Sequence, residues 1–222
     1  MSDVIETHTQ LRMLLDDKEV AGKTLRGFAA ARFGLAGADL DGITAEMVGF
    51  PEGNLSDGRL EHATLKSVDL SGASLVGALL YRVKAFANTQ MVRADLSGAE
   101  IRRCELGPHL SMESANFTGA KIQATTFSAV GLQKANFKNA VLLRTAFQDY
   151  INSPASLNKI SFVEAVLIEV DLKEVSMQGA DLSRALLIRC DLRGAHLNRS
   201  TMVGARLIDC RTEGADLSET TV

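Results

Sequence analysis

The chain has 222 residues, of which 46% are apolar, and a formal net charge of -3; disordered proteins contain far fewer apolar residues, so a folded protein with a sizeable core is expected. Its apolar runs are much shorter than the ~18 residues of a membrane span, and three cysteines are too few for a disulfide framework. We therefore expect a cytoplasmic protein without a membrane span. Leu and Ala, which together fill about a quarter of the chain, at first favour helices.

Residues 1–23 show no repeat. They carry several acidic residues and no continuous apolar stretch, which excludes a secretory signal. Ser2 can cap a helix on which Val4, Leu11 and Leu15 share one face. We expect a capping segment over residues 1–23, with a helix that covers the first end of the array that follows.

From Leu25 onward the sequence repeats with a period of five. A large apolar residue returns at nearly every fifth position up to Leu80, and six-residue steps then lead to Phe86 and, after Leu106, to Met112. Among the 40 positions of this series, the exceptions are Ala30, Ala45, Asn152 and Thr212. An internal repeat of this kind decides the fold class, so for predicting the fold it outweighs the amino-acid composition.

A second series, two residues before the first, is small, with Ala as its most frequent residue, and includes all three cysteines. A period of five fits neither a helix, where successive large residues would spiral around all sides, nor a flat strand, where they would alternate faces. The pattern fits a chain that turns a corner within every five residues, so that large and small residues point at a common axis. The helical impression from composition is therefore overruled.

The segments Ala38-Asp39-Leu40, Ala94-Asp95-Leu96 and Ala180-Asp181-Leu182 follow an A-[D/N]-L-x-x pattern, which resembles the pentapeptide repeat family over residues 24–222. The resemblance implies an all-β fold, a right-handed quadrilateral β-helix of about ten coils, with four pentapeptides in each coil. Irregular points are expected near 81–86, 107–111 and 148–156, the last as a protruding turn.

No residues suggest catalysis, a cofactor or a metal site, so we do not expect an enzyme. The four histidines lie far apart in the sequence, without metal-ligand spacing. Cys190 and Cys210 are expected to stack on adjacent coils as two packed thiols, because a cytoplasmic core disfavours a disulfide.

If every coil contains twenty residues, the outward residues can be assigned to the faces of the rod. On the face centred on Phe147, Leu167 and Leu187, the outward aliphatic residues are Val166, Ile168, Leu186, Ile188 and Ile208. On the adjacent face they are Val141, Leu143, Val163 and Val203. A contiguous apolar patch indicates a contact surface; the alternative is that repeats simply tolerate aliphatic β-formers outside. A third face, with Asp171, Asp191 and Arg211, is expected to be a solvated charge ladder.

Three functions are considered. The first is a non-catalytic interaction or scaffold protein, a rigid rod that binds a protein partner or itself through this patch or its C-terminal coils. The second is a topoisomerase (DNA gyrase) partner that protects from quinolones or a toxin by DNA mimicry, although residues 24–222 hold 22 acidic and 21 basic side chains, which is far from a strongly negative field. The third, from the segment 14–25, is an accessory module of a bacterial secretion system. Direct binding of nucleic acid is not expected, because no basic face with interleaved aromatic residues is present.

Overall fold

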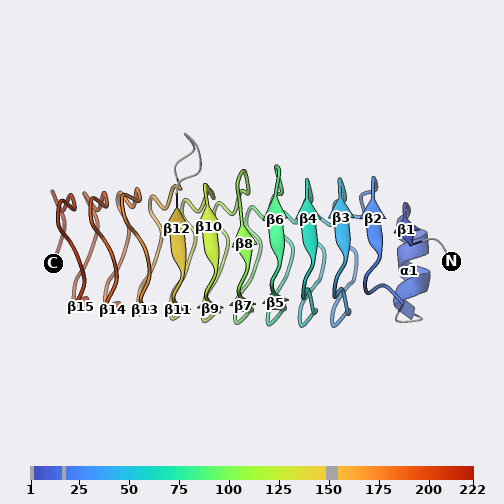
Figure 1. Cartoon of the computed structure of the whole chain (residues 1–222), viewed down its shortest axis with the longest axis horizontal. Helices are drawn as coiled ribbons and strands as arrows, with labels where there is room; N and C mark the ends of the chain where they lie inside the picture. Colours follow the sequence, from blue (N-terminus) through green and yellow to red (C-terminus); the bar gives the residue numbers. More distant parts are fainter. Residues whose placement is uncertain (1–2, 17–18, 149–154) are drawn as a thin grey trace.

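The computed structural model describes residues 3–16, 19–148 and 155–222 of the chain. About ten coils of parallel β-structure stack along one axis, with one short helix at the N-terminal end (Figure 1). The expected all-β solenoid is therefore confirmed, and the helical composition is not reflected in the fold. In the part described, no helix combines the length and the apolar character needed to cross a membrane.

Each coil has four faces, and very short strands form a parallel sheet on one face as far as Gln148 and on another face from Leu79 onward. The first sheet has the order β1-β2-β3-β4-β6-β8-β10-β12. Its strands are Val4–Ile5, Thr24–Arg26, Thr44–Glu46, Thr64–Lys66, Lys84–Phe86, Glu105–Leu106, Thr126–Ser128 and Ala146–Gln148. The second has the order β5-β7-β9-β11-β13-β14-β15. Its strands are Leu79–Tyr81, Glu100–Arg102, Lys121–Gln123, Val141–Leu143, Val166–Ile168, Leu186–Ile188 and Arg206–Ile208.

The other two faces are held by single bridges between successive coils, such as Ala29 to Gly49 and Gly34 to Asn54. Many corners have a residue in the left-handed region, for example Arg144 at φ 51° and Glu169 at φ 54°. This conformation costs a side-chain-bearing residue about 1 kcal/mol, and hydrogen bonds to the next coil stabilise it: Arg144 N donates to Ile168 O at 2.9 Å. The left-handed conformation of the corners and the hydrogen bonds between coils therefore depend on each other.

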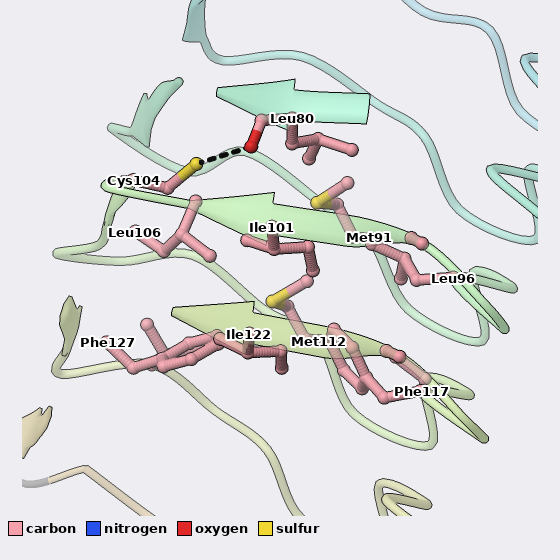
Figure 2. Close-up of a cluster of buried hydrophobic side chains, with 14 of the residues drawn as sticks. Leu80, Met91, Leu96, Ile101, Cys104, Leu106, Met112, Phe117, Ile122 and Phe127 are labelled. Atoms are coloured by element: carbon pink, nitrogen blue, oxygen red, sulfur yellow. Dashed lines mark hydrogen bonds between the residues drawn. The ribbon is translucent and has the colours of Figure 1, made fainter. Parts of the chain in front are cut away.

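The core is a set of axial columns, one for each face, filled by the large residues of the five-residue series. Figure 2 shows Leu80, Ile101 and Ile122 in one column, beside the columns Met91–Met112 and Leu96–Phe117. The small residues two positions earlier, such as Ala94 and Ala115, are fully buried beside them. One large and one small group from each pentapeptide therefore fill the narrow interior.

The N-terminal segment contains the short helix expected within residues 1–23. The helix α1 spans His8–Asp16, while Val4–Ile5 forms β1 and pairs with β2. Thr7 Oγ1 accepts from Gln10 N at 3.2 Å and Gln10 Oε1 accepts from Thr7 N at 3.1 Å, a capping box that begins the helix. Leu11 and Leu14 are buried, so α1 covers the first coil.

The first irregular point lies at Ala87–Asn88, not within the expected range 81–86. Ala85 occupies the axial position at 1% exposure, whereas Phe86 pairs with Lys66 on the outside. Because Phe86 is the larger of the two, size favours it for the axis, and this places the extra residue before Phe86 instead of after it. At the bulge, Thr89 Oγ1 donates to Phe86 O at 2.8 Å and thereby helps to satisfy the interrupted ladder.

The second extra residue lies among residues 107–109, inside the expected range. Gly107 has φ 115°, and a Cβ there would collide with the carbonyl oxygen of Ser128, so glycine is required. The third irregular point, at 148–156, lies mostly outside the described residues, and so does the protruding turn expected there.

We predict that Phe137→Ala strongly destabilises the rod. Phe137 is fully buried, stacks on Phe117 with ring centroids 4.3 Å apart, and contacts Phe162 at 5.3 Å. Truncation should lower the free energy of unfolding by about 3–5 kcal/mol, because removal of the ring leaves a cavity in the core. Guanidinium-induced unfolding followed by circular dichroism measures this. The exposed neighbour provides a control, Lys138→Ala, which should stay within about 0.5 kcal/mol; equal midpoints for both variants would contradict the prediction.

Candidate protein-interaction surface

Seven of the nine predicted surface residues lie together on the outer side of the second sheet. We call them the aliphatic face. They are Val141 and Leu143 of β11, Val166 and Ile168 of β13, Leu186 and Ile188 of β14, and Ile208 of β15. They form two adjacent columns over four successive coils, because the four strands pair in register. Val141 is 41% exposed and Ile208 36%, and the other five are half-buried.

The arrangement differs from the expected two faces because the coil step is not constant. Leu142 pairs with Leu167, a step of 25 residues, whereas a step of twenty had placed it beside Phe162. Phe162 instead follows Phe137, whose ring it contacts. The five-residue period is unbroken across this step, so the irregular point expected at 148–156 did not indicate that this coil is one repeat longer. As a result, Val141 and Leu143 belong to the same face as Ile168.

Val163 and Val203 are not part of the aliphatic face. They lie on the neighbouring face, next to the bridged residues Ser161 and Thr201. Ser183, on the intervening coil, separates them: Glu164 N donates to Ser183 O and Arg184 N to Val203 O. The two valines are therefore isolated from each other, and Val203 is 48% exposed.

Charged corner residues border the aliphatic face on both sides. The corner that follows each strand carries Arg144, Glu169, Arg189 and Asp209, from β11 to β15. Glu169 accepts from Arg144 Nε at 2.8 Å and from Arg189 Nη2 at 2.7 Å. These hydrogen bonds, the one to Arg144 first, lower the pKa of the Glu169 carboxyl below its usual value.

The corner that precedes each strand carries Asn139, Glu164, Arg184 and Gly204. On this side, Arg184 Nη2 forms an ion pair with Glu164 Oε1 at 2.8 Å. An apolar centre with a polar rim is the usual anatomy of a protein interface. The rim could not be predicted from the sequence, because the length of each coil decides which side chains 20 or 25 residues apart are neighbours.

The aliphatic face ends at charged or polar side chains toward the N-terminus. The next strand, β9, pairs directly with β11 and presents Lys121 and Gln123, which line a depression of about 250 Å³ together with Val141 and Leu143. At the other end, β15 presents Arg206 beside Ile208. In this last coil the axial residue Leu207 is 40% exposed, because no further coil of the described chain covers it.

The charged ladder expected on a third face lies on the column that continues the first sheet. Asp171, Asp191 and Arg211 are joined by bridges between successive coils. Arg193 donates to Asp191, with Nη2 to Oδ2 at 2.6 Å, and this hydrogen bond lowers the pKa of the Asp191 carboxyl. Such exposed pairs contribute little to stability.

The part of the chain that the structure describes contains no group of three or more His, Cys, Asp or Glu side chains placed to hold a metal. One pair was missed: His62 Nδ1 lies 3.0 Å from Asp41 Oδ1, one coil earlier, and the His62 ring meets the edge of Tyr81. His62 and Asp41 are about half exposed, so the pair lies on the surface and not in a cleft.

The three cysteines are unpaired thiols. Burial raises the pKa of Cys104 and of Cys190 to about 11. Cys104 Sγ donates to Leu80 O at 3.4 Å (Figure 2). Cys190 Sγ donates in the same way to Leu167 O, and Cys210, half-buried on the last coil, to Leu187 O. These thiols pack like the alanines they replace.

The sequence profile of pentapeptide repeats matches the chain in eight copies, at residues 52–82, 155–184 and 185–221. The chain belongs to the pentapeptide repeat family. Two solved pentapeptide repeat structures are similar in fold. HetL, involved in heterocyst differentiation regulation in the cyanobacterium Nostoc sp. strain PCC 7120, is 24% identical, with 95% of this chain and 96% of HetL covered and a TM-score of 0.40.

The second structure is trypsin-treated QnrB1, a plasmid-mediated fluoroquinolone resistance protein. It is 19% identical, with 88% of this chain and 91% of that chain covered and a TM-score of 0.40. No curated protein sequence matches this pentapeptide repeat chain significantly.

We predict that the native rod exposes one thiol to alkylation near pH 8, that of Cys210. At a pKa of about 11, only about one in a thousand of the Cys104 and Cys190 thiols is ionised at that pH, and both are buried. Mass spectrometry of iodoacetamide-treated protein should find Cys210 modified first, and all three after denaturation. The variant Cys210→Ala should lose the fast reaction. Equal rates at Cys104 and Cys210 would refute this.

Proposed function

We propose that this pentapeptide repeat chain is a non-catalytic protein-interaction module that binds protein through the aliphatic face. The observation that carries the proposal is the contiguity of seven aliphatic side chains over four coils. Isolated exposed apolar residues are common on protein surfaces, whereas a contiguous patch with a polar rim indicates a binding site.

The rest of the coil geometry supports a scaffold. Successive coils are joined by parallel ladders and by axial columns of buried side chains, so the face is presented on a rigid support. A preformed surface loses little conformational entropy on binding, which favours affinity from a small area. The corner residues Arg144, Glu169 and Arg189 hold one another by hydrogen bonds before any partner arrives.

Mimicry of DNA is not the function that we adopt. A mimic needs an uncompensated acidic surface, and carboxylates such as Glu164 and Glu169 are paired with arginines one coil away. Among the described residues, no structural feature favours a role in secretion.

We predict that Ile168→Lys combined with Ile188→Lys abolishes protein binding by this face. Both side chains lie at its centre, and a buried lysine without a partner is costly. Immobilised wild-type and variant chains are exposed to lysate of the source organism, and retained proteins, including further copies of this chain, are quantified by mass spectrometry. We expect at least tenfold less of a face-dependent partner on the variant.

The matched control is Val163→Lys, an equally apolar outward position on the neighbouring face of the same coil as Ile168. It should retain the same proteins as the wild type, and circular dichroism should show intact β-structure in every variant. If the double variant retains the same proteins in the same amounts as the wild type, the proposed function is wrong.

A further inference from the structure

We propose that the occupant of the aliphatic face is a second copy of this chain, bound face to face with the two rods antiparallel. The inference rests on the proposed function and names its partner. In this arrangement a two-fold axis runs along the strand direction, midway between β13 and β14. Each coil then faces a different coil of the second copy: β13 faces β14, and β11 faces β15. Such a contact is isologous, since the same patch is used on both copies.

The apolar columns match under this operation. Because the axis runs along the strands, each outward position faces the equivalent position of another strand. Ile168 faces Ile188 of the second copy, and Val166 faces Leu186. Leu143 faces Ile208 in the same way. At the margin, Arg206 faces Val141, the most exposed residue of the face at 41%, and the aliphatic stem of an arginine can cover such a side chain while its charge stays in water.

The rim supplies the evidence that selects a second copy. Along the corner that follows each strand, the charges alternate from β11 to β15 as Arg144, Glu169, Arg189 and Asp209. Reversing this order places an opposite charge at every position, so Glu169 faces Arg189 and Arg144 faces Asp209. Along the other corner, Glu164 faces Arg184. The rim is therefore complementary to itself, which fixes orientation and register.

The other face-to-face arrangements that have a two-fold axis bring like charges together. With the rods parallel, the two corners exchange places, so Glu164 faces Glu169 and Arg184 faces Arg189. Shifting the antiparallel pair by one strand opposes Arg144 to Arg189 or, in the other direction, Glu169 to Asp209. Only the axis between β13 and β14 pairs every rim charge with its opposite.

The contact is small, so the dimer should be weak and reversible. Four strands at ~4.8 Å spacing and about 10 Å of face width give a footprint of about 200 Å² in projection. Stable interfaces bury about 800 Å² of accessible surface on each partner. We therefore expect a monomer–dimer equilibrium that becomes visible at high micromolar concentration.

Sedimentation equilibrium of the full chain over a wide concentration range tests the dimer. We expect the wild type and Val163→Lys to dimerise alike and Ile188→Lys to dimerise at least tenfold more weakly, each with unchanged circular dichroism. A dimer that Ile188→Lys leaves intact would use another surface and would overturn the inference.

Charge reversal tests the orientation. In the antiparallel dimer Arg184→Glu places two carboxylates opposite each other twice, so dimerisation should weaken several-fold. The double variant Glu164→Arg with Arg184→Glu restores opposite charges and should return the wild-type affinity. With parallel rods, Arg184→Glu would face Arg189 and tighten the dimer, and that result would overturn the proposed geometry.

Cross-linking tests the register. In a Cys210→Ala background, a mixture of Leu143→Cys and Ile208→Cys chains should be joined by a bismaleimide of about 10 Å reach, the spacing of packed sheets. Leu143→Cys alone should not cross-link, because three strand spacings, about 14 Å, offset it from its own copy. Efficient self-cross-linking of Leu143→Cys would refute the register.

The failure of this inference can be told apart from the failure of the proposed function. If the wild type is monomeric at every concentration while another protein binds in a way that Ile168→Lys with Ile188→Lys abolishes, the second copy is excluded as occupant and the binding face stands. If neither self-association nor binding depends on the face, both are wrong.

Discussion

The structure depends on one constraint, that a narrow axis must receive one large side chain from every five residues. Parallel hydrogen bonding between coils holds successive large residues in columns such as Leu80, Ile101 and Ile122. The small residues between them, and the left-handed corners, are what allow the chain to return to the axis so often. Because the interior is fixed in this way, the outward positions carry almost no structural demand, and they are free to differ from coil to coil.

Sequence reasoning recovered what this constraint dictates. The period of five predicted a chain that turns a corner within every five residues and the side chains that point at its axis, because both depend on the spacing of large residues. The solenoid and its four faces were implied by the resemblance to the pentapeptide repeat family. Sequence reasoning failed where size and spacing gave conflicting or insufficient information. Ala85 is axial and Phe86 is outside, since a small axial residue is tolerated where neighbouring columns fill the space. At the N-terminus, the local capping box of Thr7 and Gln10 decided where the helix begins.

The candidate surface could be predicted in part. The aliphatic residues were recognisable by their types at outward positions. Their grouping was not, because placing Leu142 beside Leu167 needs the number of residues in the intervening coil. The ion-paired rim needed the same information. Exposed ion pairs of this kind contribute at most about 1 kcal/mol each to folding, so the alternation of Arg144, Glu169 and Arg189 has more consequence for what the face can meet than for its stability.

The step of 25 residues between β11 and β13 has a consequence for how such a surface arises. Lengthening one coil by a single repeat leaves every downstream large residue on the axis, yet it turns all downstream outward residues by one face. The core remains equivalent while the surface is redistributed as a block. In this chain the shift unites Val141 and Leu143 with Ile168 and Ile188, so the gain or loss of one pentapeptide is enough to assemble or disperse an entire patch in a single genetic event, without a substitution at any of its residues.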